Sequence, residues 1–206
     1  MIIIVDYKMG NLGSILNMLK KIGTLAMASS LPEDILQADK LILPGVGAFD
    51  NGMTNLKESG LLSVLNEKVL AKKTPILGIC LGMQLLTRQS AEGRLEGLGW
   101  IEADTVRFRL DREKSSPLKV PHMGWNTVMF AHGSILSSGL EKEARFYFVH
   151  SFHVVCDKED NVAGKTLYGY EFVSAVQKNN IYGVQFHPEK SHKFGLQLLK
   201  NFVELS

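Results

Sequence analysis

Three residues of this chain have the types and spacing of a covalent catalytic site. The first is Cys80, which lies in the run Gly78-Ile-Cys-Leu-Gly82, where an apolar stretch gives way to a helical pattern. A sharp strand-to-helix turn exposes the side chain at its apex, and flanking glycines remove side chains that would crowd the turn. The N-terminus of the following helix favours the thiolate, which is the nucleophilic form. Most free cysteines are small buried apolar residues, but this pattern indicates a nucleophile.

The other two residues are His187 and Glu189, in the closing run Gly183-Val-Gln-Phe-His-Pro-Glu189. Two residues apart in an extended segment, their side chains leave the chain on the same side. A histidine can take the thiol proton and return it to a leaving amine, while a carboxylate fixes its tautomer. By itself, the His-x-Glu pattern is explained by a solvated strand end. Taken together with Cys80, the pattern indicates acyl transfer through a catalytic triad.

Two further features accompany the triad. Pro44-Gly-Val-Gly47 ends a buried strand, and it is either an ordinary turn or a loop whose backbone N–H completes an oxyanion hole with that of Leu81. It lacks the Lys-Ser/Thr of a phosphate-binding loop. Gln84, one helical turn beyond Cys80, either binds a polar substrate or is simply polar surface. Cys156 ends an apolar strand without flanking glycines and is interpreted as structural.

The elements that must position these residues alternate in the first half of the chain. Short apolar runs at 2–5, 25–28, 40–43 and 75–79 suit strands buried on both faces, and helical patterns occupy 11–22 and 53–70. Strand-helix alternation predicts a mostly parallel sheet covered by helices on both faces.

The second half changes character and predicts antiparallel additions to that sheet. Its expected strands are 100–109, 146–155, 167–170, 174–177 and 181–186, and a last helix covers roughly 193–204. The expected architecture is an α/β three-layer sandwich, formed by residues 1–206 as one domain.

Composition excludes several classes of function. The two cysteines among 206 residues do not make a disulfide framework, so a reducing cytoplasmic location is expected. No signal peptide and no membrane-spanning run is recognisable. A net charge of +2, from 23 basic and 21 acidic residues, argues against nucleic acid or an anionic membrane as the main ligand. The histidines outside the triad lack metal-ligand spacing, so no metal is expected.

The motif around Cys80, taken with His187-Pro-Glu189, resembles the triad class of glutamine amidotransferases, which implies a flavodoxin-like sandwich. Within that class the chain is similar, from its first residue to its last helix, to the glutaminase subunit of imidazole glycerol phosphate synthase. The motifs that carry this similarity are Asp6-Tyr7, Gly10-Asn11, Pro44-Gly-Val-Gly-Ala-Phe49, Pro121-His-Met-Gly-Trp-Asn126, Tyr147-Phe-Val-His-Ser151 and Pro188-Glu-Lys-Ser191.

The resemblance implies a role for each matching residue. Cys80 would attack the glutamine side-chain amide, with His187 as general acid and base and Glu189 as its orienting partner. The oxyanion hole would comprise Leu81, Val46 and Gly47. The glutamine pocket would comprise Gly45, Gly47, Gln84, Ser151 and Phe152. No metal or organic cofactor is implied.

The resemblance also implies a partner, because ammonia released to water at neutral pH is protonated and lost as a nucleophile. That partner would be a (β/α)₈-barrel cyclase subunit in a heterodimer, producing imidazole glycerol phosphate and an aminoimidazole carboxamide ribotide in histidine biosynthesis. The positions matching its interface are Asn11, Trp125, Tyr147, His150 and Lys190. The alternative to an interface is that these residues have ordinary structural roles, as a helix cap, a core aromatic residue and solvated polar groups.

Two departures leave the acceptor open. Lys8 replaces the usual glycine of the first motif, and Ser191 is followed by His192, as in paralogues found with surface-polysaccharide genes. Such a paralogue would supply ammonia to an amidino-type nucleotide sugar. A catalytically silent regulatory subunit is an alternative of another class, against which the intact triad weighs. A flavodoxin-like cysteine hydrolase or stress protein ranks last, since it would lack the Pro-Gly-Val-Gly strand end and His-Pro-Glu.

Overall fold

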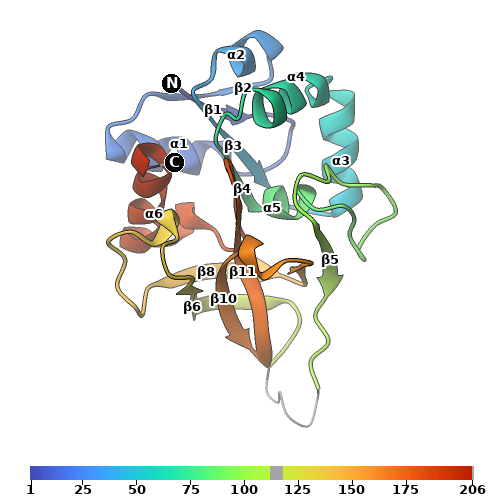
Figure 1. The fold of residues 1–206 in the computed structure, drawn as a ribbon, viewed down its shortest axis with the longest axis vertical. Coiled ribbons are helices and arrows are strands. Elements are labelled where there is room, and N and C mark those ends of the chain that lie inside the picture. Colours follow the sequence, from blue (N-terminus) through green and yellow to red (C-terminus); the bar gives the residue numbers. More distant parts are fainter. Residues whose placement is uncertain (112–117, 206) are drawn as a thin grey trace.

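The central feature of the computed structural model, which describes residues 1–111 and 118–205, is one large mixed sheet (Figure 1). Its main path runs β2-β1-β3-β4-β12-β11-β10-β7, with β9 paired to β11 and β5 to β9. The first five strands of the path are parallel and the others are antiparallel. In chain order the ten strands are β1 (Ile2–Val5), β2 (Ala26–Ser29), β3 (Lys40–Gly45), β4 (Ile76–Cys80), β5 (Ala103–Arg107), β7 (Met129–Phe130), β9 (Phe152–Cys156), β10 (Val162–Tyr168), β11 (Tyr170–Lys178) and β12 (Ile181–Val184).

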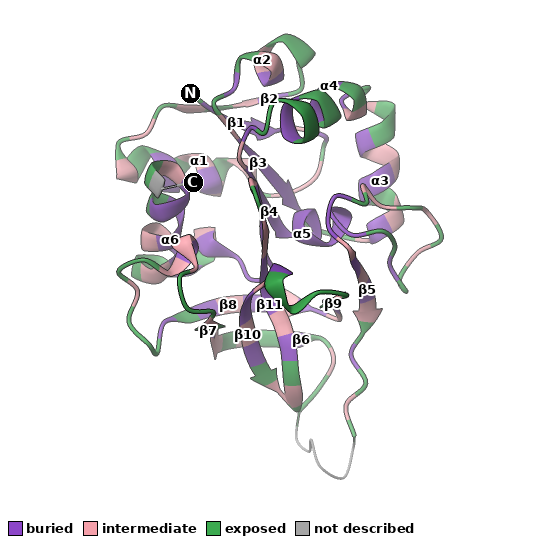
Figure 2. Ribbon diagram, in the orientation of Figure 1, coloured by how far each residue is buried: buried purple, intermediate pink, exposed green. Residues whose placement is uncertain are grey.

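Helices cover both faces of the parallel part, as Figure 1 shows. Alternate residues of β1 demonstrate the two cores: Ile3 and Val5 pack in one, while Ile2 and Ile4 pack in the other. This explains why the first strand is continuously apolar rather than alternating, and Figure 2 colours it as buried. The first core contains α2 (Pro32–Gln37), α3 (Phe49–Glu58), α4 (Leu62–Asn66) and α5 (Leu81–Leu85); the second contains α1 (Leu12–Ile22) and α6 (His192–Leu205).

The predicted three-layer α/β architecture is therefore confirmed, but three predicted elements are divided. The strand predicted at 167–170 spans the end of β10 and the start of β11, which are separated by Gly169 with a φ of +75°. The helical pattern at 53–70 is broken at Gly60, whose φ of +71° is incompatible with a right-handed helix; α4 follows and continues as a π-helical turn, Glu67–Ala71. The predicted strand 146–155 is two strands. β8 (Arg145–His150) pairs with β6 (His122–Thr127) in a separate two-stranded sheet, whereas β9 joins the large sheet, so the chain changes sheets at Ser151.

The strand order brings the important segments to one edge. β4 lies between β3 and β12, and all three run in the same direction. The carboxyl ends of adjacent parallel strands meet at the same side of a sheet, which is where open α/β sheets bind their ligands. The 44–47 segment, Cys80 and the segment leading to His187 follow those three ends, so the topology itself gathers them.

Candidate active site

Cys80 is the apex of a strained strand-to-helix turn. It is the last residue of β4, immediately before α5, with φ 54° and ψ −110°. A non-glycine residue in this region costs conformational energy and persists only where the surroundings impose it. The flanking glycines allow the close packing that holds this turn. A Cβ on Gly82 would lie 1.9 Å from the Leu43 carbonyl oxygen, and one on Gly78 would lie 2.8 Å from the Gly82 carbonyl. The predicted reason for both glycines is thereby confirmed.

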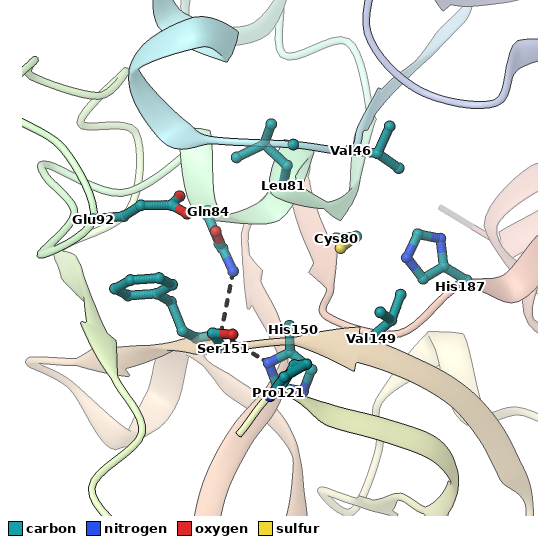
Figure 3. A pocket seen from close by; sticks show the side chains of 12 residues that line it. Val46, Cys80, Leu81, Gln84, Glu92, Pro121, Val149, His150, Ser151 and His187 are labelled. Carbon is teal, nitrogen blue, oxygen red and sulfur yellow. Dashed lines mark hydrogen bonds between the residues drawn. The ribbon is translucent and has the colours of Figure 1, made fainter. Parts of the chain in front are cut away.

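His187 and Glu189 form a buried pair beside the cysteine. Nδ1 of His187 lies 2.8 Å from Oε1 of Glu189, and the two side chains are 2% and 3% exposed. Because a carboxylate only accepts, Nδ1 carries the proton and Nε2 is left free to act as a base. Nε2 makes no hydrogen bond with the described residues, and Figure 3 shows the ring on the same side of the cavity as the Cys80 sulfur. The tautomer is thus the one that a triad requires.

The electrostatics of this pair favour a protonated imidazole. Burial lowers the pKa of His187, but the neighbouring Cys80 and Glu189, both acidic, raise it and prevail, so the pKa lies above its ordinary value. A histidine with a raised pKa readily takes the thiol proton, which gives a thiolate-imidazolium pair.

The backbone around the pair differs from the sequence expectation. β12 ends at Val184, and Glu189 lies in a 3₁₀ turn, Pro188–Lys190, rather than on an extended strand. His187 is held by its own N–H, which donates to Tyr147 O at 2.9 Å. Ser191, to which sequence reasoning assigned no role, donates to His187 O at 2.6 Å and accepts from Tyr147 N at 3.0 Å. The histidine is therefore anchored to β8 as well as to its own strand.

A cavity of about 320 Å³ opens beside the thiol, large enough for a small amino acid (Figure 3). Six of the residues predicted for the oxyanion hole and the glutamine pocket line it, and the seventh, Gly45, does not. Gly45 packs behind the cavity, where an added Cβ would lie 2.7 Å from Gly82 N. The lining comprises Val46, Gly47, Cys80, Leu81, Gln84, Glu92, Pro121, Val149, His150, Ser151, Phe152 and His187.

Two polar side chains were given no role from the sequence: Glu92, which lines the cavity, and Gln185, which lies behind the thiol. Among the described residues that line the cavity, Glu92 is the only one with a carboxylate, and its Oε2 accepts from Phe49 N at 2.8 Å. Gln185 is fully buried, and its Nε2 lies 3.7 Å from Sγ of Cys80. Gln185 could have been found, because it precedes His187 by two residues and extended residues at that spacing face the same way. Glu92 follows no comparable pattern.

Four of the five predicted interface residues lie outside the cavity. The Trp125 ring is 39% exposed, stacks on His192 with centroids 5.3 Å apart, and meets Tyr147 edge-on. Lys190 Nζ lies 5.5 Å from the centroid of the Tyr147 ring. Asn11 is exposed and caps α1 by accepting from Ser14 N at 3.2 Å.

His150 differs from that prediction. It is only 6% exposed and lines the cavity, so its side chain faces the interior of the site rather than the open surface. Burial lowers its pKa to about 3, which keeps the ring neutral. His150 belongs to the interior of the site.

The described residues contain no group of three or more His, Cys, Asp or Glu side chains placed to hold a metal ion. Among those same residues, no helix is both long enough and apolar enough to span a membrane. What the arrangement can do is nucleophilic attack by a thiolate in a small, partly enclosed cavity.

Comparison with known proteins agrees with this chemistry. The family profile described as "Glutamine amidotransferase class-I" matches residues 3–205. The chain is 59% identical to imidazole glycerol phosphate synthase subunit HisH 2 of Methanococcus maripaludis, covering 99% of both chains. It is 53% identical to the subunit of the same name in Pseudomonas aeruginosa, covering 100% of both.

Solved structures agree in fold. A crystal structure of a glutamine amidotransferase superposes with a TM-score of 0.71 at 20% identity, covering 98% of this chain and 97% of that one. At that identity the likeness concerns the fold alone, whereas the sequence relatives reach the level of a family. The chain belongs to the class-I glutamine amidotransferases and, within them, to the family of imidazole glycerol phosphate synthase HisH subunits.

Proposed function

We propose that this chain is a glutaminase subunit that hydrolyses glutamine to glutamate and ammonia, and that it supplies the ammonia to a cyclase subunit in histidine biosynthesis. The observation that carries the proposal is the strained Cys80 beside the His187–Glu189 pair, at the edge of a cavity of about 320 Å³. The HisH relatives, similar over the whole chain, support the choice of glutamine as substrate and of this pathway.

The reaction begins when Nε2 of His187 takes the thiol proton and Sγ of Cys80 attacks the side-chain carbonyl carbon of glutamine. The negative charge that develops on the oxygen is stabilised by backbone N–H groups of Leu81 and of the Val46–Gly47 segment. His187 then gives its proton to the nitrogen as the C–N bond breaks, releasing ammonia and leaving a glutamyl thioester. Water, deprotonated by His187, attacks the thioester; collapse of that intermediate releases glutamate and restores the thiol.

The lining suits the substrate at both ends. Ser151, Gln84 and the carboxylate of Glu92 lie on the opposite side of the cavity from His187 (Figure 3), and Phe152 also lines the cavity. A glutamine α-ammonium group would complement that carboxylate, so Glu92 is our candidate for recognising the substrate as an amino acid. Gly47 has a φ of +108°, which turns the loop over the thiol.

We further propose a heterodimer with a (β/α)₈-barrel cyclase in the cytoplasm. The cluster of Trp125, Tyr147, Lys190 and His192, with Asn11, is the candidate docking surface, because its aromatic rings are partly exposed beside the segment that holds His187. Aromatic side chains are enriched at the centres of protein interfaces, so Trp125 and Tyr147 carry this assignment. A docked barrel would receive ammonia before water protonates it.

The test measures glutamate release by the purified chain, alone and with the histidine-pathway cyclase and its nucleotide. Stimulation by that cyclase is expected, together with complete loss of activity in Cys80→Ala and retention in the matched control Cys156→Ala. Glutamate release by Cys80→Ala would refute the mechanism. If only an amidino-sugar barrel stimulates the chain, the acceptor is the polysaccharide precursor instead.

A further inference from the structure

Gln185 joins the nucleophile to a chain of buried hydrogen bonds. Its Nε2 donates to Sγ of Cys80 at 3.7 Å, while its Oε1 accepts from Nε2 of Gln84 at 3.0 Å. The Gln84 nitrogen also donates to Phe152 O at 3.2 Å. Gln185 is 0% and Gln84 5% exposed, so water does not compete for these groups.

The chain continues outward through two histidines. Nδ1 of His150 lies 2.7 Å from Phe152 O, so Nδ1 carries the proton and Nε2 accepts. The donor to that Nε2 is Nδ1 of His122 at 3.0 Å, which leaves Nε2 of His122 to accept from Asn126 Nδ2 at 3.3 Å. Each ring is therefore neutral in one tautomer, and a second proton on either ring would set two donors against each other.

These contacts determine which end of the Gln185 amide faces the sulfur. An amide can present either its oxygen or its nitrogen. The Phe152 carbonyl requires the Gln84 nitrogen, and that nitrogen in turn requires the oxygen of Gln185. The remaining N–H of Gln185 is thereby directed at Cys80. A reversed amide would place an oxygen against the thiolate and repel it.

We propose that Gln185 is a positioning residue that stabilises the Cys80 thiolate through its side-chain N–H, and that Gln84 fixes its orientation. This rests on the proposed glutaminase function only for its consequence in turnover. An N–H donor directed at an anion in a water-poor site stabilises the charged form more than it stabilises the neutral thiol. The Gln84 amide nitrogen thus acts on the nucleophile indirectly, through the oxygen of Gln185 that it holds.

The test is the pH profile of Cys80 alkylation by iodoacetamide, with peptide mass spectrometry separating Cys80 from Cys156. The alkylation test requires no glutamine turnover. The proposal about Gln185 can therefore fail while the glutaminase function holds, and the glutaminase function can fail while the proposal about Gln185 holds. Gln185→Leu should move the midpoint up by about one pH unit and slow alkylation about tenfold below it. Gln84→Leu should give a smaller shift in the same direction. With the partner present, Gln185→Leu should lower kcat about tenfold with little change in KM.

The matched control is Gln197→Leu on α6, whose amide contacts Asn201 and Ser138 and not the cavity. Its alkylation profile should equal that of the unmodified protein. If Gln185→Leu does not fold, Gln185→Met takes its place. If neither Gln185 variant folds, the alkylation profile of Gln84→Leu tests the proposal. An unchanged profile in a folded Gln185 variant, or in Gln84→Leu where that variant decides, would overturn the proposal.

Discussion

Gly45 at the end of β3 lies directly opposite Cys80 at the end of β4 in their parallel register. The strands approach so closely that a Cβ on Gly45 would lie 2.8 Å from both the Leu81 Cβ and the Tyr7 hydroxyl. That hydroxyl is buried and donates to Pro44 O at 2.5 Å. The strands that lead to the candidate oxyanion loop and to the nucleophile are thus joined by one backbone ladder.

The first prediction concerns the turn itself. Gly82→Ala should destabilise the fold by at least about 3 kcal/mol, because its Cβ would meet the Leu43 carbonyl, a backbone atom that cannot move aside. The measurement is the free energy of unfolding in urea. Gly13→Ala in α1 is the control: nothing lies within 4 Å of its Cβ, and a gain of about 0.5 kcal/mol is expected. Equal stabilities of the two variants would show that the close packing at Gly82 is not needed.

The second prediction concerns the loop at Gly47. Its φ of +108° costs an alanine about 1–3 kcal/mol, and the new Cβ would also lie 3.3 Å from Met9 Cε. Since the segment follows β3 at the cavity, Gly47→Ala should move the loop and lower kcat for glutamine at least about tenfold. A tenfold loss corresponds to an increase of ~1.4 kcal/mol in the activation free energy. Steady-state kinetics with the partner present would measure this.

Gly60→Ala provides the comparison for that loop. Gly60 has a φ of +71° but no neighbour within 4 Å, and it lies between α3 and α4, away from the cavity. Its alanine variant should lose about 1 kcal/mol of stability and keep its turnover. If Gly47→Ala also kept full turnover, the loop would have no part in the oxyanion hole.

The third prediction separates orientation from proton transfer. Glu189→Gln should lower kcat by ~10²–10⁴, by analogy with other triads, because the amide no longer selects the tautomer with the proton on Nδ1. The pKa of His187 should fall as the carboxylate that raises it is removed. The pH dependence of kcat/KM would report both effects. Glu141→Gln is the control, since its bond to Lys193 lies at the surface, and wild-type kinetics for Glu189→Gln would dismiss the orienting role.

The sequence predicted the fold well where local pattern and burial agree. The continuously apolar run at 2–5 and the amphipathic stripe of α1 indicate strand and helix without ambiguity, and the structure places both within a residue of expectation. It failed where long-range contacts decide. The break at Ser151 arises because β8 pairs with β6 and β9 with β5, and no local residue pattern records which partner a strand takes.

The candidate site divides in the same way. Cys80, His187 and Glu189 were recognisable because each belongs to a short motif with a mechanical reason. His150 was assigned to the interface and Gln185 was given no role. The spacing from His187 points to Gln185, but the hydrogen-bond partners of both side chains lie 28 to 105 positions away and leave no local pattern. Burial of a polar side chain, unlike its identity, is decided only when the whole chain has folded.

The last prediction follows from the buried histidines. Burial lowers the pKa of His122 to about 4 and of His150 to about 3, and it also lowers the pKa of His153. In the unfolded chain all three would titrate near ~6.5. Between pH 6.5 and about 4 the unfolded state therefore binds protons that the native state does not, so the native state loses stability as the pH falls. His187 acts in the opposite direction: its pKa is raised, so it stabilises the native state as the pH falls towards 6.5 and offsets part of this loss.

His122, His150 and His153 together cost up to about 4 kcal/mol between pH 7.5 and 5.5, at ~1.4 kcal/mol each, and His187 offsets about 1.4 kcal/mol of this. A net loss of about 1–3 kcal/mol is therefore expected. Exposed carboxylates with lowered pKa values, such as Asp50 and Asp157, titrate below this window. Urea unfolding across the range measures the slope. His153→Gln removes one titrating group that does not line the cavity, and should reduce the slope. A stability that does not change over those two pH units would mean that the three rings are not held neutral in the folded protein.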